Sequence, residues 1–454
     1  MASKRGEQDY HGVFTTKTVV VHPKARPPFM AASSTLLPLS NLDTKCPALM
    51  YLVFFYRPTQ APASSSSSSL FSSLKRGLEE VLSSWYPAAG RLCLSLPSGK
   101  LALACTGAGA LLVEAATAAK ISDLGDLSQP KDFFDRLVSK PPVHAPLEET
   151  PLVIAQVTRF GCGGYAIGVG TNHALFDGVA NYIFLNAWAS RARAAVGGQQ
   201  THEPVHERGR LLALPDQHDH GDSNDQEEFM ALGHLHQLIK QAVREGERSP
   251  EEKMVLRTFS VGCAMVNRLK NKAASSCTSF EVVAAHLWKA RTKALNIAGH
   301  KTVCLQFTVD ARDRIRPPLP PSFAGNAFVL SSLLSTAADL DRLPFAALVL
   351  RIQAAKRAVT HAYVARYVAA LGEAPRTSLP PLPELTMVSD WTKTPYHRVD
   401  FGAGEAAYVA PLATPMPQTA YFLQSPGEAG RVDVRIGLPE KSLRPFESYF
   451  LSGF

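Results

Sequence analysis

The chain has 454 residues, of which 46% are hydrophobic and 19% charged, a profile typical of a globular protein with ample apolar material for a core. Its 47 basic and 39 acidic residues give a formal net charge of +8, but no arginine- or lysine-rich block accompanies this excess. A nucleic-acid partner is therefore not indicated, although a locally basic cleft would suit an anionic small molecule.

The seven cysteines are odd in number and include no C-x-x-C pair. This pattern argues against a disulfide framework or a zinc finger and favours a reducing compartment. The first ten residues are polar and charged, and no apolar run reaches the about 20 residues that span a bilayer. We therefore expect a cytoplasmic protein with no membrane span and no bound metal.

Several elements are predicted in the first part of the chain. A β-branched run, residues 18–21, predicts an early strand, and residues 36–43 are typical of a loop. The nearly continuous apolar run 50–56 predicts a buried strand. Residues 57–69, which end in six serines, predict a flexible surface loop, and apolar residues recurring on one face over 70–85 predict a helix.

A histidine follows the next two predicted strands. Residues 151–160 and 163–170 predict strands, and His173-Ala174-Leu175-Phe176-Asp177-Gly178 comes after them. Apolar residues at helical spacing then predict a helix that ends near residue 195. The histidine is thus expected where a strand turns into a helix, which would hold an imidazole rigidly at the edge of a cleft.

Neutral imidazole is abundant near pH 7, so His173 could take a proton from a hydroxyl or an amine. Asp177 would fix the turn, because a carboxylate four residues along can pair with a cation without reaching the ring. The His-x-x-x-Asp pattern is weak evidence when taken alone, and a purely structural turn is the alternative.

The second half of the chain begins after a polar segment, residues 198–250, which we interpret as a crossover between domains. Its six histidines are interpreted as solvated loop residues, with a metal site as the alternative: His202, His206, His218, His220, His234 and His236.

Further elements are predicted beyond residue 250. Thr278 and Glu281 form a capping-box pattern at the start of a helix in which His286 is interpreted as a packed residue and not as a second base. Residues 303–309 predict a strand and 346–370 a long helix. The alternation over 432–436 predicts an edge or half-exposed strand.

Two motifs carry a resemblance to a known family. Residues 173–178, HALFDG, resemble the HxxxDG signature of the plant BAHD acyl-CoA-dependent acyltransferases, and residues 400–404, DFGAG, resemble its DFGWG signature. Segments 84–92, 279–291 and 309–326 resemble other conserved stretches of that family, in the family's order. Together the matches are highly specific and cover nearly the whole chain.

The resemblance implies an α/β fold of two chloramphenicol-acetyltransferase-like domains, each a mixed β-sheet flanked by helices. We expect an N-terminal domain over 1–200 that carries HxxxDG, a crossover loop over 201–250, and a C-terminal domain over 251–454 that carries DFGAG. It also implies acyl-CoA as co-substrate with no permanently bound cofactor, a small-molecule acceptor, and a monomer.

The resemblance also implies a mechanism. His173 would deprotonate the acceptor, which then attacks the thioester carbonyl directly and releases coenzyme A. No acyl-enzyme is needed, and no G-x-S-x-G elbow is present. Asp177 would pair with Arg312, and Lys270 is a candidate for binding coenzyme A. Motif residues expected to support the structure are Gly178, Asp400, Gly402 and Gly404.

Two positions depart from the family's pattern. Ala403 stands in place of the tryptophan of DFGWG, which removes an indole N–H donor and a large volume. Three consequences are open: another group donates the hydrogen bond, the acceptor pocket is wider, or catalysis is weak. Lys393 occupies the place of an arginine that grips the acceptor carboxylate in shikimate-type enzymes, so a shikimate or quinate acceptor is not expected. Both residues are candidates for the acceptor pocket.

The favoured hypothesis is transfer of an acyl group, of hydroxycinnamoyl type, to a hydroxyl or amine of a plant specialised metabolite, lipid or hormone. The main alternative is a non-catalytic member of the family that binds a partner or regulates one, which the altered second signature supports. A Ser–His hydrolase is disfavoured, because no nucleophile motif is present.

Overall fold

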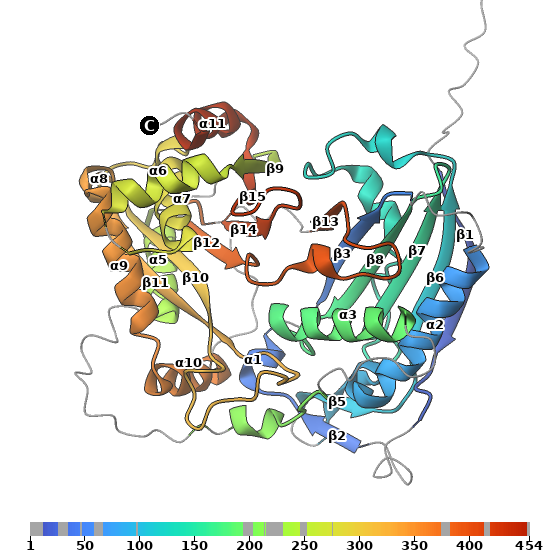
Figure 1. The fold of residues 1–454 in the computed structure, drawn as a ribbon. Helices are drawn as coiled ribbons and strands as arrows, with labels where there is room; N and C mark the ends of the chain where they lie inside the picture. The colour runs from blue at the N-terminus through green and yellow to red at the C-terminus, as the bar shows by residue number, and fades with distance from the viewer. Residues whose placement is uncertain are drawn as a thin grey trace, which may run out of the picture. The chain divides into compact units, whose positions relative to one another are not determined.

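The structure of the chain is a computed structural model that describes residues 12–25, 35–45, 48–58, 67–96, 99–193, 203–212, 214, 230–245, 252–274, 276–373, 382–412 and 418–451. The chain divides into two compact units, each made of three segments. Unit 1 comprises Met1–Leu39, Cys46–Val205 and Tyr396–Leu412, and unit 2 comprises Ser40–Lys45, His206–Pro395 and Ala413–Phe454. A twisted sheet with helices packed on it forms the centre of each unit (Figure 1).

Unit 1 contains a six-stranded sheet. Its strand order is β1 (Val13–Val21), β6 (Ala110–Thr117), β7 (Val153–Phe160), β8 (Tyr165–Asn172), β3 (Leu49–Tyr56) and β13 (Tyr408–Pro411). Neighbouring strands are antiparallel except for the parallel pair β6 and β7. A second, three-stranded sheet has the order β2 (Thr35–Pro38), β5 (Lys100–Cys105) and β4 (Arg91–Ser95).

Helices cover both faces of the larger sheet of unit 1, which explains the apolar run of β3. Val53 and Phe55 belong to a core cluster shared with η3 (Ile121–Leu124) and η4 (Asp132–Leu137). Phe54 points the other way, as alternate strand residues must, and contacts Phe401. The predicted buried strand is thus confirmed, and its lack of alternation reflects burial on both sides.

Two long helices lie side by side in unit 1 (Figure 1). They are α2 (Ser67–Ser84) and α3 (Gly178–Arg193), and the indole Nε1 of Trp188 donates to the Leu74 carbonyl at 2.9 Å. The predicted helices over 70–85 and after Asp177 are confirmed. Residues 67–69 lie in α2, so the predicted loop is wrong there, and residues 59–66 lie outside the described residues.

Unit 2 contains the other six-stranded sheet. Its strand order is β11 (Phe328–Thr336), β10 (Thr302–Asp310), β12 (Leu385–Asp390), β14 (Thr419–Gln424), β15 (Val432–Pro439) and β9 (Met254–Val261). The pairs β10–β12 and β12–β14 are parallel, and the other neighbouring pairs are antiparallel. The strand predicted over 303–309 is confirmed as β10.

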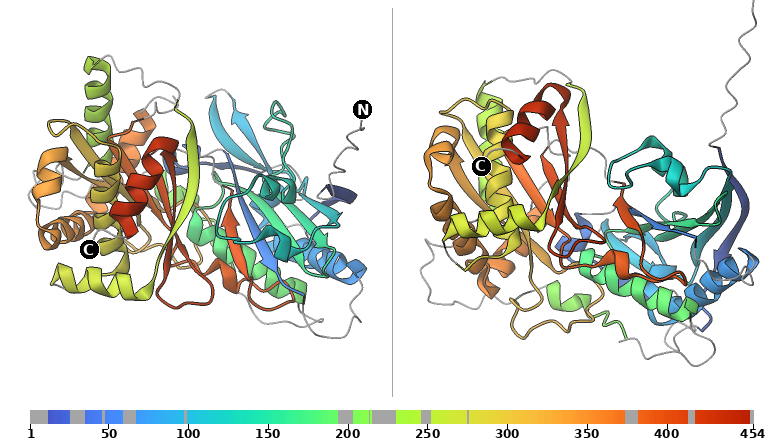
Figure 2. Two further views of the ribbon diagram at one scale, coloured as in Figure 1. Left: turned by 90° about the horizontal axis from the view of Figure 1, so that it is seen from above. Right: turned by 45° about the horizontal axis from the view of Figure 1, so that its top comes forward.

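Most helices of unit 2 pack on one face of this sheet (Figures 1 and 2). They include α6 (Cys263–Ala273), α7 (Ser279–Ala294), α9 (Phe345–Arg357) and α11 (Leu443–Leu451). The opposite face of β10 meets α5 (Ala231–Glu245), because Cys304 clusters with Leu238 whereas Val303 and Leu305 face the main core. α5 thus places a packed helix within the range predicted as a crossover loop.

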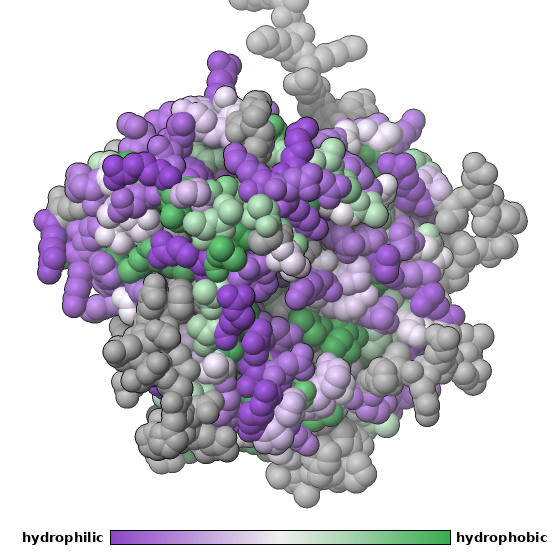
Figure 3. All heavy atoms as spheres, turned by 60° about the vertical axis from the view of Figure 1, so that its left-hand side comes forward, coloured by the Kyte–Doolittle hydropathy of each residue, from purple (hydrophilic) through white to green (hydrophobic). Residues whose placement is uncertain are grey.

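The remaining helical elements among the described residues are α1 (Asn41–Thr44), η2 (Tyr86–Ala89), η5 (Arg208–Leu211), α8 (Ala337–Arg342), α10 (His361–Glu373), η6 (Tyr396–Arg398) and η7 (Glu440–Ser442). None of the helices among the described residues is long and apolar enough to cross a membrane. Hydrophilic side chains predominate on the face drawn in Figure 3, and hydrophobic ones form smaller areas between them.

The units differ from the continuous ranges 1–200 and 251–454 by two exchanged segments. Residues 40–45 join unit 2, where the Asp43 carboxylate accepts from Arg208 at 2.9 Å and from the Asn326 side chain at 2.8 Å. Residues 396–412 join unit 1, where β13 pairs with β3. The DFGAG signature therefore lies in the same compact unit as His173.

Three local predictions are wrong for identifiable reasons. Residues 36–43 form β2 and α1 and not a loop, because Ser40 makes a capping box with Asp43. The single helix over 346–370 is two helices, because the Thr360 hydroxyl accepts from the Tyr363 N–H at 3.3 Å and starts a new helix. The predicted edge strand over 432–436 lies between β14 and β9 and is buried.

The error at β15 arises from its buried charges. The Asp433 carboxylate accepts from the Ser260 hydroxyl at 2.7 Å and from Arg431 at 3.2 Å. Arg435 donates from Nε to the Thr258 hydroxyl at 3.1 Å. Alternating polar residues usually mark a solvated face, but here they are satisfied inside the protein.

Candidate active site

The turn after β8 holds His173. Its backbone N–H donates to the Ala48 carbonyl at 2.8 Å. The Asn172 side-chain oxygen accepts from the Ala174 N–H at 2.9 Å, and the Asn172 carbonyl accepts from the Leu175 N–H at 2.9 Å. His173 is therefore the first residue after the strand, in a tight turn, with a half-buried side chain.

The residues that follow His173 anchor this turn in the core. Ala174, Leu175 and Phe176 are buried. The Phe176 ring stacks on Phe184 with ring centroids 5.0 Å apart and lies 5.5 Å from Trp85. The motif thus consists of one half-buried imidazole followed by buried apolar side chains, whose packing fixes the backbone of the turn.

Asp177 is the N-cap of α3. Its carboxylate accepts from the Ala180 N–H at 2.8 Å, and the side chain is only 3% exposed. A carboxylate here also meets the positive end of the helix dipole. Asp177 fixes the turn in this way, a role that the N-cap preference of aspartate could have indicated from sequence. The ion pair with Arg312 stays a prediction.

A chain of hydrogen bonds braces the start of α3. The Thr171 hydroxyl donates to the Asn181 side-chain oxygen at 3.1 Å, and the Asn181 amide donates to the Tyr396 hydroxyl at 3.4 Å. Tyr396 in turn donates to the Gly178 carbonyl at 2.9 Å. Burial raises the pKa of Tyr396 well above its ordinary value, so the hydroxyl remains a donor.

The second signature forms a turn around Asp400. Its carboxylate accepts from the Gly402 N–H at 2.7 Å and from the Gly404 N–H at 2.8 Å. The φ angles of these glycines are 117° and 80°, a region that disfavours other residues. Ala403 sits half-buried between them. The structural role of Asp400, Gly402 and Gly404 stays a prediction, and these hydrogen bonds are the contacts through which it would act.

α3 connects the two signatures. Asp177 caps its first turn, and Arg193 at its last residue donates to Asp400 at 2.9 Å. Between them, Trp188 packs on Phe401 with ring centroids 4.9 Å apart. One helix thus fixes both motifs within unit 1, although the motifs lie far apart in sequence.

The remaining predicted site residues lie in unit 2. Arg312 is buried and donates to Asp310 at 3.2 Å and to the carbonyl of Gly325 at 3.3 Å, so it is not an ordinary surface cation. Lys270 is half-buried in the last turn of α6, and Lys393 is exposed.

Two other histidines are structural. Nε2 of His286 is 2.8 Å from the Phe450 carbonyl, and burial lowers the pKa of this imidazole to about 4. The interpretation of His286 as a packed residue is confirmed. His234 is also buried, with a pKa lowered to about 4 and a 2.7 Å contact to Ser332, so its interpretation as a solvated residue is wrong. Of the other crossover histidines, His202, His218 and His220 lie outside the described residues.

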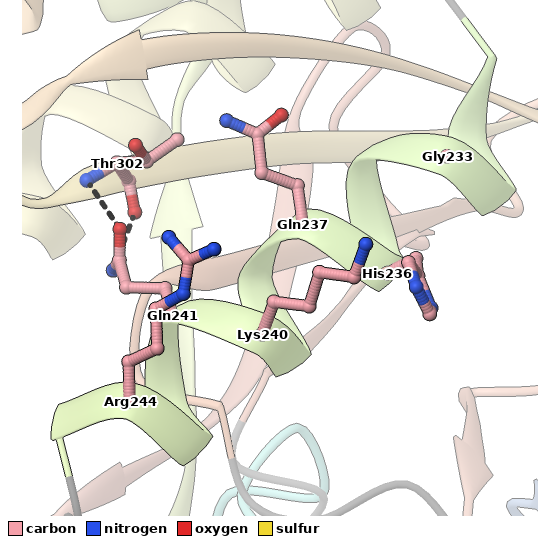
Figure 4. Close-up of a pocket in the computed structure, with 7 residues that line it drawn as sticks. All are labelled: Gly233, His236, Gln237, Lys240, Gln241, Arg244 and Thr302. Atoms are coloured by element: carbon pink, nitrogen blue, oxygen red, sulfur yellow. Dashed lines mark hydrogen bonds between the residues drawn. The ribbon is translucent and has the colours of Figure 1, made fainter.

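An open hollow of about 500 Å³ lies against α5 and is lined by Gly233, His236, Gln237, Lys240, Gln241, Arg244 and Thr302 (Figure 4). The Gln241 side-chain oxygen accepts a hydrogen bond from the Thr302 backbone N–H at 3.1 Å. His236, Lys240 and Arg244 are exposed, so water and salt screen their charges. The lining includes none of the predicted site residues, and we assign it no role. Among the described residues, no three His, Cys, Asp or Glu side chains gather to hold a metal ion.

Comparisons with known proteins match nearly the whole chain. A family model described as the Transferase family matches residues 13–452. Brassinosteroid-related acyltransferase 1 of Arabidopsis thaliana is 45% identical over 92% of this chain and 93% of its own length. Fatty alcohol:caffeoyl-CoA acyltransferase of the same plant is 31% identical over 90% and 92%.

A solved structure shows the same fold. The crystal structure of vinorine synthase aligns with a TM-score of 0.73 at 20% identity, covering 97% of this chain and 98% of that one. The predicted α/β fold class, with two sheet-containing domains, is thereby confirmed.

Proposed function

The chain belongs to the BAHD family of acyltransferases and is an acyl-CoA-dependent acyltransferase, and we propose that it moves a hydroxycinnamoyl group onto a hydroxyl of a lipid or steroid alcohol. The observation that carries the proposal is the rigid turn after β8, which presents one half-buried imidazole, His173, from a backbone fixed at both sides. His173 is the general base.

The reaction follows from the basicity of imidazole. His173 removes the proton of the acceptor hydroxyl as its oxygen attacks the thioester carbonyl carbon. The tetrahedral oxyanion then collapses, the C–S bond breaks, and the thiol of coenzyme A leaves with the proton that His173 held. Because the backbone of His173 is fixed on both sides, less entropy is lost in aligning the ring with the acceptor than from a free loop.

Stabilisation of the oxyanion is the step that Ala403 affects. The backbone N–H groups of Gly402 and Gly404 are both occupied by Asp400, and alanine offers no side-chain donor. The family's indole N–H thus has no counterpart in this turn. We propose that the space left at Ala403 accommodates a bulky acceptor, at the expense of some oxyanion stabilisation.

Two relatives support the substrate class. One is named for caffeoyl-CoA and a fatty alcohol, and the more similar one for its relation to brassinosteroids. The exposed Lys393 supports the same choice, because an ammonium cannot grip an acceptor carboxylate with the two-pronged geometry of arginine.

The test is a matrix of purified protein with donors and acceptors. Caffeoyl-, feruloyl- and acetyl-CoA would each be combined with a brassinosteroid, a long-chain alcohol, shikimate and a long-chain amine. Free thiol is followed with a chromogenic disulfide, and products are identified by mass spectrometry. We expect acceptor-dependent release with hydroxycinnamoyl thioesters and the steroid or long-chain alcohol. His300→Ala is the matched control for His173→Ala, because His300 is exposed in unit 2.

Two outcomes would redirect the proposal. If only shikimate or the amine is acylated, the proposed acceptor class is wrong, but the proposed role of His173 as general base is unaffected. Equal thiol release by the parent and His173→Ala, across all pairs, would favour the non-catalytic alternative, in which the chain binds a partner. The proposal includes a cytoplasmic location and a monomer, which a fluorescent fusion and light scattering would test.

A further inference from the structure

Tyr396 lies where the DFGAG segment meets the turn that carries His173. It begins η6 and is buried, and it lies in unit 1 although it follows 190 residues of unit 2 in the sequence, His206–Pro395. Its hydroxyl donates to the Gly178 carbonyl at 2.9 Å and accepts from Asn181 at 3.4 Å. Gly178 directly follows Asp177, the cap of α3.

The hydroxyl of Tyr396 donates to a carbonyl in the first turn of α3, next to the cap. The ring itself is held by edge contacts to Phe54 at 6.5 Å and to Tyr182 at 5.7 Å. Asp177 is close enough for its charge to favour the neutral phenol. The turn is thereby held from two directions, by its own side chains and by a residue from the second half of the chain.

We infer that Tyr396 is a positioning residue for the base: its hydrogen bond to the Gly178 carbonyl fixes the orientation of the segment His173–Gly178, so that the imidazole keeps the position from which it deprotonates the acceptor. The inference rests on the proposed function of His173. Tyr396 acts through the turn and does not touch the reacting atoms.

The physical basis is the cost of a loose turn. Without the hydroxyl, the half-buried Gly178 carbonyl and the buried Asn181 amide each lose a hydrogen-bond partner. The turn can then shift to reach other partners, and a displacement of about 1 Å at a catalytic group can cost about 10²-fold in rate. Because Tyr396 acts through the turn, we expect the binding of the acyl-CoA donor to change little.

The test compares Tyr396→Phe with Tyr363→Phe. Tyr363 is the matched control because it is also buried and its hydroxyl also donates to a backbone carbonyl, that of Leu330 at 2.6 Å, in unit 2. We expect both variants to lower the melting temperature. Only Tyr396→Phe should lower kcat, by about 10-fold or more, with KM for the acyl-CoA within about two-fold of the parent.

A second readout does not depend on turnover. Carbethoxylation of His173 by diethyl pyrocarbonate, measured by peptide mass spectrometry with the exposed His300 as internal reference, reports how accessible the ring is, and a loosened turn should expose it more. We expect at least three-fold faster modification of His173 in Tyr396→Phe and the parent rate in Tyr363→Phe. Thr171→Val, which removes the first bond of the chain with little change of shape, should shift the rate in the same direction by less.

The outcomes distinguish the positioning role of Tyr396 from the proposed acyltransferase function of His173. If the parent shows no acyl transfer but Tyr396→Phe still speeds modification of His173, the proposed function fails and the positioning role stands. If Tyr396→Phe folds and keeps both the parent kcat and the parent modification rate, the inference is overturned. A loss of kcat in Tyr363→Phe equal to that in Tyr396→Phe would also overturn it, since the effect would then be general destabilisation.

Discussion

His173 and His286 are both histidines in signature stretches of the chain, and their surroundings make them opposite kinds of group. His173 follows a strand, and its half-buried ring sits on a turn fixed by backbone hydrogen bonds. His286 lies inside α7, where its ring stacks on Phe450 and its Nε2 meets a carbonyl. The same side chain is thus packed against its neighbours inside a helix and left half-buried at the end of a strand, and the proposed base is the second of the two.

Replacing each of the two histidines tests the contrast between them. His173→Ala should lower kcat by about 10²- to 10⁴-fold, because general base catalysis is lost, while the melting temperature stays close to the parent value. His286→Phe should keep kcat within a few-fold, because its imidazole is engaged with a carbonyl inside unit 2. Thiol release with the active donor and acceptor pair measures both. A comparable loss in the two variants would refute the assignment of the base.

The second prediction concerns stability against pH. Burial lowers the pKa of His286 to about 4 in the folded chain, whereas the unfolded chain takes up the proton near its ordinary value of about 6.5. The contribution of His286 to the free energy of unfolding is therefore nearly constant above about pH 6.5 and falls as the pH drops from 6.5 towards 4. Between pH 7.5 and 5, this histidine should cost on the order of 2 kcal/mol of the free energy of unfolding.

Urea unfolding at the two pH values measures this effect. His286→Phe should lose less stability than the parent on acidification, by that same amount, while His300→Ala should follow the parent. His234, which is also buried with a pKa lowered to about 4, contributes a second loss of the same sign, so the parent curve is steeper than one histidine explains. Parallel pH dependence in His286→Phe and the parent would contradict the buried, neutral state of this ring.

The same contrast shows what the sequence could and could not predict. The turn of His173 is predictable because it is local: strand, histidine and helix follow each other along the chain. The contact of Tyr396 is not predictable, because its bond to Gly178 joins residues 218 positions apart and no local spacing indicates it. The pairing of β13 with β3, which places DFGAG beside α3, is equally non-local.

The burial of charged residues is the second feature that the sequence does not predict. Polar alternation over 432–436 predicted exposure, but Asp433 and Arg435 are buried with polar partners from β9. Arg312 is likewise buried and bonded to backbone carbonyls. Sequence patterns give polarity, and only the fold determines whether a polar group finds a partner inside.

The smallest expected effect tests the turn that distinguishes His173 from His286. Asp177→Ala removes the N-cap of α3 and should cost about 1 kcal/mol of the free energy of unfolding, whereas Asp177→Asn keeps an oxygen for the Ala180 N–H and should cost only a few tenths. Urea midpoints at unchanged denaturant slope measure the difference. If Asp177→Asn instead costs as much as Asp177→Ala, the negative charge matters more than the cap, because asparagine supplies the cap alone. The charge can act through the dipole of α3 or through the predicted ion pair with Arg312, and a double-mutant cycle of Asp177→Asn with Arg312→Gln separates the two, because an ion pair makes the two losses non-additive.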